Sequence, residues 1–376
     1  MKRLVYILLI VVVGCVKPYN PPPITGNGNY LVVDGVINAG TDSTIITLSR
    51  TVNVSSANAG NPVLNATVAV LSDQNISFPL TETTNGNYVS PGLNLDVNRQ
   101  YRLSIATNSE QYQSDLVPVT IAPPIDSIGF KIANIPSPGV QIYANTHDAR
   151  NTVKYYRWDY TETWEFRSYY VSYYVGNGIA LGIRPANQQI YECFANDVSS
   201  DIVLGSTANL QQDVLYQSPI TFIPSTSEKI EDEYSILLRQ YALTAGAYNF
   251  WLKLKTNTEE LGGIFDAQPS EIIGNIHCIN NPTEPVIGYV SACTVTSKRI
   301  FIISQQLPFW LPAYPYSCMQ DTMNSYSPFL IFQGGSTIAT GPVPKGNVVP
   351  VSVATSDRQC ADCTLRGTRA RPPFWQ

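Results

Sequence analysis

The strict alternation of side chains over residues 156–166 restricts the fold more than any other part of the sequence. One face carries Tyr156, Trp158, Tyr160, Glu162, Trp164 and Phe166, and the other carries Arg157, Asp159, Thr161, Thr163, Glu165 and Arg167. A period of two is typical of a β-strand, because successive side chains point to opposite faces of a sheet. We therefore expect a long strand whose aromatic face packs inward or onto a partner and whose charged face meets water.

The aromatic face has two interpretations. Tyrosine and tryptophan rings in a row could form a platform on which sugars or peptides stack, so we take this face as a candidate ligand or partner surface. It comprises Tyr156, Trp158, Tyr160, Glu162 and Trp164. The alternative, which we favour, is the core of a sheet. The carboxylate of Glu162 fits a core poorly.

The rest of the chain also favours strands. Of 376 residues, 27 are proline, 24 glycine and 23 tyrosine, while only 14% are charged. This composition is typical of short strands joined by many turns, and the length suits two packed domains. We predict a mainly β fold, with an immunoglobulin-like or transthyretin-like β-sandwich over residues 30–121. A larger β-rich domain with one helix follows over residues 125–376.

Two local predictions concern the second domain. Residues 244–260 read as its helix, with Thr244 as the N-cap and an apolar stripe of Tyr248, Trp251 and Leu252. Residues 272–279 and 286–295 read as strands that form a hairpin around an Asn-Pro turn.

The N-terminus predicts export and lipidation. Lys2 and Arg3 precede a ten-residue apolar segment that is too short to span a bilayer. It ends in Val-Val-Gly-Cys, which looks like a bacterial lipobox with Cys15 as the lipid attachment site. We expect residues 1–14 to be a lipoprotein signal peptide and residues 15–29 to be a proline-rich tether. The anchor is then the lipid alone.

Six further cysteines are disulfide candidates: Cys193, Cys278, Cys293, Cys318, Cys360 and Cys363. In an exported chain an even number favours disulfides, with fifteen full pairings open. The expected hairpin places Cys278 and Cys293 too far apart for a bridge. Cys360 and Cys363 form a CxxC motif, but no helical pattern follows it and no second CxxC accompanies it. Structural disulfides are therefore favoured over a metal site or redox catalysis.

Signals of catalysis are weak. The sequence holds two histidines, His147 and His277, and lacks a Gly-x-Ser-x-Gly elbow and a phosphate-binding glycine loop. We expect no enzymatic activity, no cofactor and no metal. The net charge of −5 also disfavours nucleic acid as a partner.

Several segments together resemble one family. They are the lipobox at Cys15 and residues 30–35, 48–51, 123–128, 234–240, 262–267 and 274–276, followed by the Cys-Ala-Asp-Cys-Thr-Leu-Arg-Gly-Thr and Pro-Pro-Phe-Trp sequences near the end. The ensemble is similar to domain-of-unknown-function family 4249, lipoproteins of Bacteroidota. The resemblance implies an outer-membrane lipoprotein whose gene often neighbours that of a TonB-dependent transporter. It carries over no catalytic residue.

Phe374 and Trp375 near the C-terminus form a second candidate partner surface. They either pin the tail onto its own domain, which we favour, or insert into a partner.

Taken together, the sequence predicts a non-enzymatic outer-membrane lipoprotein that assists a TonB-dependent transporter or captures a glycan or peptide ligand. The alternatives are a free-standing adhesion or structural module of the envelope and a surface glycan hydrolase. The tether leaves open whether the protein faces the periplasm or the cell surface.

Overall fold

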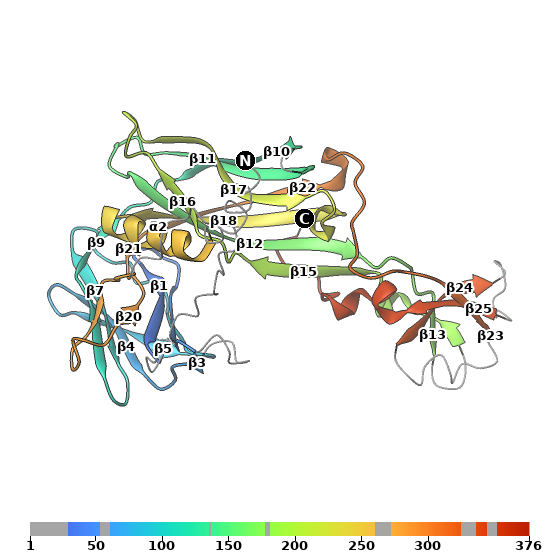
Figure 1. Ribbon diagram of the computed structural model, residues 1–376, viewed down its shortest axis with the longest axis horizontal. Coiled ribbons are helices and arrows are strands. Elements are labelled where there is room, and N and C mark those ends of the chain that lie inside the picture. The colour runs from blue at the N-terminus through green and yellow to red at the C-terminus, as the bar shows by residue number, and fades with distance from the viewer. Residues whose placement is uncertain are drawn as a thin grey trace, which may run out of the picture.

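The computed structural model describes residues 29–52, 61–134, 137–176, 181–259, 272–324, 336–343 and 352–375. Strands dominate these ranges, which confirms the mainly β prediction, and α2 (Ala245–Glu259) is their one α-helix. Figure 1 shows three bodies in a row, with a β-rich body at each end of a central one. In the described ranges, no helix combines the length and apolar character that crossing a bilayer requires.

The N-terminal body is a sheet that closes on itself. Its hydrogen-bonded path leads from β7 through β4, β5, β6, β2, β1, β21 and β9, and β9 returns to pair with β7. Alternate side chains such as Val68 and Val70 point into its core, which explains the period of two in these strands. Its strands from the first part of the chain are β1 (Leu31–Asn38), β2 (Thr44–Arg50), β3 (Asn61–Pro62), β4 (Thr67–Ser72), β5 (Ser77–Glu82), β6 (Asn87–Ser90), β7 (Gln100–Ala106), β8 (Gln111–Ser114) and β9 (Val117–Thr120).

A later segment of the chain completes this body. Strand β19 (Ile276–Cys278) pairs with β8, and β20 (Val286–Ile287) pairs with β1. Strand β21 (Ala292–Cys293) pairs with both β1 and β9. The hairpin expected between 272–279 and 286–295 is therefore wrong, because both segments add to the earlier sheet instead of pairing with each other. In place of the expected sandwich over residues 30–121, the N-terminal body is this one closed sheet, and it also takes in β19, β20 and β21, which the sequence predicts to belong to the second domain.

The central sandwich consists of two sheets. A five-stranded sheet runs β15-β12-β18-β22, with β16 beside the start of β12, and a three-stranded sheet runs β10-β11-β17. Residues of β11 such as Val140 and Ile142 share one hydrophobic core with the aromatic face of β12. The strands are β10 (Ile125–Ala133), β11 (Gly139–His147), β12 (Tyr155–Arg167), β15 (Glu192–Val198), β16 (Val203–Ser206), β17 (Val214–Pro224), β18 (Glu233–Leu243) and β22 (Val295–Ile303).

The distal lobe projects from the far end of the central sandwich (Figure 1). It contains the hairpin β13 (Tyr174–Gly176) and β14 (Leu181–Ile183) and the sheet β23 (Asp321–Asn324), β25 (Ser352–Asp357) and β24 (Thr337–Val343). The short 3-10 helices η1 (Ala186–Gln188), η4 (Arg358–Cys360) and η5 (Cys363–Leu365) lie where the lobe joins the sandwich. Two further 3-10 helices, η2 (Glu228–Ile230) and η3 (Ser304–Gln306), belong to loops of the sandwich.

Helix α2 lies between the N-terminal body and the central sandwich (Figure 1). The hydroxyl of Thr244 accepts a hydrogen bond from the backbone N–H of Ala247 at 3.2 Å, which confirms the predicted N-cap. The predicted apolar stripe is only partly right, because the buried side chains are Ala247 and Phe250 while Leu252 is exposed. The helix packs against both neighbouring bodies, so its buried face does not follow one simple stripe.

Candidate functional site

A cleft of about 670 Å³ lies between the N-terminal body and the central sandwich. One wall consists of β1 and the residues after β20, and the other consists of β12, the loop between β15 and β16, and helix α2. Its main side chains are Asp34, Arg157, Asp159, Asp201, Phe250, Trp251, Glu259 and Tyr289. Clefts of this size between structural units are typical ligand sites.

Aromatic rings form one part of the cleft. Phe250 lies edge-to-face with Trp251 at 5.6 Å between ring centres, and Tyr289 lies 5.5 Å from Phe250. The guanidinium of Arg157 lies 3.8 Å from the centre of the Trp251 ring and 5.5 Å from that of Tyr241. These cation–π contacts fix the Trp251 ring and the Arg157 charge relative to each other.

Carboxylates form another part of the cleft. Asp159 is engaged, since it accepts hydrogen bonds from Arg239 Nε and from the Tyr241 hydroxyl at 2.7 Å. Burial, together with the Asp159 charge, raises the pKa of Tyr241 above its usual value, so this hydroxyl stays protonated and donates. Asp34 and Asp201 are exposed at the cleft. The cleft therefore offers hydrogen-bond acceptors beside aromatic surface.

Gly288 holds the wall formed by the residues after β20 close to β1. Its φ of +146° is a conformation that side chains disfavour. A Cβ atom at this position would lie 2.2 Å from the carbonyl oxygen of Val33. Only glycine lets the two backbones approach this closely, so Gly288 holds the two segments of this wall together.

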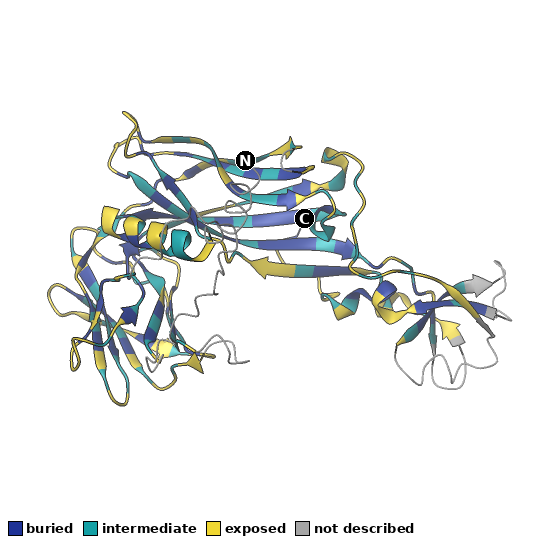
Figure 2. Ribbon diagram, in the orientation of Figure 1, coloured by how far each residue is buried: buried dark blue, intermediate teal, exposed yellow. Residues whose placement is uncertain are grey.

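The aromatic face of β12 is not part of this cleft. Tyr156, Trp158, Tyr160, Trp164 and Phe166 are all buried in the core of the central sandwich. Figure 2 shows much of β12 in the colour of buried residues. The indole N–H of Trp158 donates to Gln240 Oε1 at 2.9 Å, which satisfies its polar atom inside the core. The assignment of this face as a ligand or partner surface is wrong, and the core interpretation is confirmed. The opposite face supplies Arg157 and Asp159 to the cleft.

Glu162 has a structural explanation. Its side chain is 6% exposed, accepts a hydrogen bond from the Tyr234 hydroxyl at 2.7 Å and pairs with the ammonium of Lys229. Lys229 also lies 5.0 Å from the centre of the Trp164 ring. The carboxylate is thus held by a donor and a cation inside the sandwich, away from the cleft residues.

The C-terminal tail is docked on its own domain. Thr368 forms a bridge with Phe194 of β15, and Trp375 packs edge-to-face between Phe194 and Phe301 at 5.2 and 5.5 Å. Trp375 is only 7% exposed, so its assignment to a free partner surface is wrong. Phe374 remains 41% exposed and lies 3.7 Å from the guanidinium of Arg299.

The six cysteines divide into two disulfides and two thiols. Cys193 bonds Cys363, and Cys318 bonds Cys360, so each cysteine of the CxxC motif has a distant partner. Cys278 and Cys293 are free and buried, which corrects their assignment as disulfide candidates and agrees with the exclusion of a bond between them. The disulfides link the CxxC motif, which precedes the C-terminal tail, to β15 and to the segment between η3 and β23.

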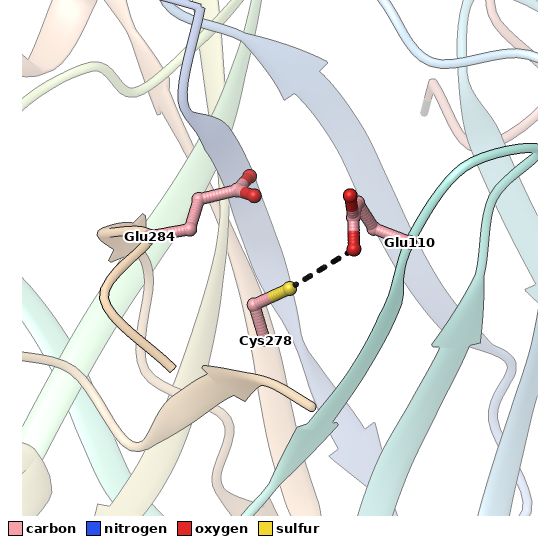
Figure 3. Close-up of side chains that lie close together, drawn as sticks. All are labelled: Glu110, Cys278 and Glu284. Carbon is pink, nitrogen blue, oxygen red and sulfur yellow. Dashed lines mark hydrogen bonds between the residues drawn. The ribbon is translucent and has the colours of Figure 1, made fainter. Parts of the chain in front are cut away.

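Cys278 belongs to a cluster in the N-terminal body. Its thiol lies with Glu110 and Glu284, and the three potential ligand atoms are within 4.8 Å of one another (Figure 3). Burial raises the pKa of the thiol, which donates to Glu110 Oε2 at 3.6 Å. Glu284 accepts from the Tyr112 hydroxyl at 2.8 Å and lies 3.7 Å from Arg50. A protonated thiol and an adjacent guanidinium suit a hydrogen-bonded cluster better than a cation site.

Sequence reasoning did not identify the cleft. Its residues come from β1, β12, the β15–β16 loop, α2 and the segment after β20, and none forms a motif with the others. The available signals were Trp251 on the predicted helix and the charged face of residues 156–166. The predicted lipid attachment site Cys15 lies outside the described residues.

Residues 16–299 match the family model described as Domain of unknown function (DUF4249). The match spans more than half of the chain, so the chain belongs to this family. A search of curated proteins found no match.

Proposed function

We propose that this member of the DUF4249 family is a lipid-anchored outer-membrane protein that captures a glycan or peptide and assists a TonB-dependent transporter. The observation that carries the proposal is the cleft between the N-terminal body and the central sandwich. Ligand sites commonly lie between structural units and combine apolar walls with a few polar groups, as this cleft does.

The chemistry of the cleft favours a ligand that is rich in hydroxyl or amide groups. Aromatic rings such as Trp251 and Tyr289 stack on the apolar faces of sugars or on peptide side chains. The carboxylates of Asp34 and Asp201 accept hydrogen bonds from O–H and N–H donors, and Arg157 supplies a donor group. Both glycans and peptides offer such complementary groups.

Binding without catalysis is the better supported role. The hydrolase alternative needs carboxyl groups, and Glu162, the carboxylate on the aromatic face of β12, is buried in the sandwich and held by Tyr234 and Lys229. Asp159 in the cleft is likewise engaged by Arg239 and Tyr241. Glycoside hydrolysis needs two carboxyl groups that flank the scissile bond, so in this cleft it would fall to the exposed Asp34 and Asp201, and cleavage of a bound glycan tests it.

The anchor and the transporter partnership rest on the sequence. A short apolar segment before Cys15 supports lipidation, and the tether that follows would hold the cleft near a membrane surface. A ligand-capturing protein beside a transporter raises the local concentration of its cargo.

The partnership can be tested in cells. The protein is tagged in the exposed loop at residues 208–212, crosslinked in cells and extracted in mild detergent. The proteins that co-purify with it are then identified. The proposal predicts a TonB-dependent barrel in near-stoichiometric amount. Recovery of the protein alone, under conditions that preserve a known transporter–lipoprotein pair, would overturn the partnership and favour the adhesion alternative.

A further inference from the structure

A second hollow, of about 370 Å³, lies at the base of the distal lobe, where β14, η1, β24, η4 and η5 meet. Three arginines from distant parts of the chain line it: Arg184, Arg358 and Arg369. We call it the arginine pocket. It shares no lining residue with the cleft, and the proposed function makes no use of it.

Arg184 is fixed in place by neutral acceptors. Its Nε donates to the carbonyl of Ser172 at 3.1 Å, and Nη2 donates to the Ser172 hydroxyl at 3.0 Å and to the carbonyl of Tyr174 at 3.2 Å. Nη1 donates to the carbonyl of Gln188 at 3.3 Å. These contacts orient the guanidinium but do not neutralise it. Burial lowers the pKa of Arg184 from its usual value, as expected for a cation that lacks a direct carboxylate contact.

Arg369 is held in the same way. Its Nη1 donates to the carbonyl of Asn187 at 2.6 Å and of Gln189 at 3.5 Å, and the side chain reaches the pocket from the C-terminal tail. Among the described residues, no carboxylate forms an ion pair with Arg184 or Arg369.

Asp362 supplies the negative charge of the pocket lining. It is buried, and its Oδ2 accepts from Arg358 Nε at 2.7 Å. Its Oδ1 accepts from the backbone N–H of Thr364 at 3.0 Å and from the hydroxyl of the same residue. Asp362 therefore neutralises one of three guanidinium groups, and the described lining keeps an excess of positive charge.

The sequence around the pocket supports this imbalance. Residues 307–376 hold five basic side chains and three acidic ones, whereas the whole chain carries a net charge of −5. Arg358 and Arg369 are exposed to water, so the attraction of the hollow for anions comes from the excess of guanidinium groups and is strongest at low ionic strength.

We propose that the arginine pocket binds the oxyanion group of a small molecule, a carboxylate or a phosphate. The forked donors of a guanidinium match the oxygen geometry of both groups. Val175, Ile190 and Ile338 add apolar surface that accommodates a short carbon skeleton. A volume of about 370 Å³ restricts the ligand to a small molecule.

The two disulfides hold lining residues of the arginine pocket in place. Arg358 lies two residues before Cys360, and Asp362 and Thr364 flank Cys363. The bonds Cys318–Cys360 and Cys193–Cys363 hold η4 and η5 against the rest of the molecule. Less conformational freedom then has to be lost when the ligand binds.

Isothermal titration calorimetry on the full chain in detergent, at low ionic strength, tests the proposal with two probes, inorganic phosphate and succinate. We expect saturable binding of at least one probe, and the probe that binds more tightly identifies the anion class. Arg369→Gln should weaken that binding at least tenfold, and Arg369→Lys should restore part of it. Arg371→Gln, a charge-matched change two residues away, should leave the affinity within about twofold.

Arg369 is exposed, so its substitutions should leave the melting temperature unchanged, and this is measured in parallel. Reduction of the disulfides should also weaken binding. The proposal is overturned if neither probe binds, if Arg369→Gln binds as tightly as the parent protein, or if Arg371→Gln weakens binding equally.

Discussion

The Arg157 guanidinium lies 3.8 Å from the centre of the Trp251 ring, so strand β12 and helix α2 are joined directly at the cleft. Arg157 belongs to the face of β12 that the sequence predicts to meet water. Helix α2 covers that face at its start, where Tyr155 also packs against Tyr248 at 4.7 Å. The same strand thus supplies the core of the sandwich with one face and the cleft with the other.

This contact should stabilise the protein by a measurable amount. Trp251→Leu and Arg157→Met should each lower the free energy of unfolding, and the double-mutant cycle should give a coupling of about 1 kcal/mol. Urea denaturation of the four proteins measures it. Strictly additive effects would show that the two side chains do not interact in solution.

The two disulfides fix the number of free thiols. When the protein is exported with an ordinary signal peptide in place of residues 1–15, six cysteines remain. Denaturation without a reductant should expose two reactive thiols, those of Cys278 and Cys293, and peptide mapping should find them labelled. Labelling of Cys360 or Cys363, or the absence of any reactive thiol, would contradict this pairing.

Loss of the Glu162–Lys229 ion pair should be partly rescued by a second substitution. Lys229→Met leaves a buried carboxylate without its cation and should cost about 3 kcal/mol of stability. Adding Glu162→Gln removes that charge while the amide oxygen still accepts from Tyr234, so the double variant should be more stable than Lys229→Met alone. Thermal unfolding of the three variants decides the order. A double variant that is less stable than Lys229→Met would refute this role for the pair.

Asp148 should make stability depend on acid pH. Its carboxylate accepts hydrogen bonds from the backbone N–H groups of Arg150, Thr152 and Val153 and from the Thr152 hydroxyl. Burial alone would raise its pKa, but these hydrogen bonds outweigh burial and hold the pKa well below its usual 3.8.

Because the folded protein lowers this pKa, the stabilisation is present above about pH 4 and is lost as the pH falls below that value. Asp148→Asn should therefore cost about 2 kcal/mol at pH 7 and reduce the loss of stability between pH 4 and 2. Asp42→Asn, at an exposed turn, is the matched control and should have little effect. Identical acid unfolding curves for Asp148→Asn and the parent protein would contradict the account.

The sequence predicted features that are encoded locally. The period of two in residues 156–166 identified the strand, and Thr244 identified the start of the helix. The favoured core interpretation of the aromatic face was also right, because five large rings on one face of a strand stabilise the fold most when buried. Glu162 fitted the core interpretation poorly in the sequence, because Lys229, the cation that balances its charge, lies 67 residues away.

Other features depend on contacts that local patterns do not encode. The strands β19, β20 and β21 have two or three residues each, too few for a period to appear, and they pair with strands from the start of the chain. The sequence left the disulfide pairing open, because each cysteine of the CxxC motif bonds a partner that is distant in the chain. The cleft and the arginine pocket likewise form only when separate segments meet.

Ligand binding at the cleft can be measured directly. The purified protein is screened on arrays of oligosaccharides and peptides, together with Trp251→Ala, Asp201→Ala and the control Trp310→Ala, which lies outside the cleft. We expect a ligand that is bound but not cleaved and whose affinity falls at least tenfold in both cleft variants but not in the control. Cleavage of the ligand, or binding that neither cleft variant changes, would contradict it.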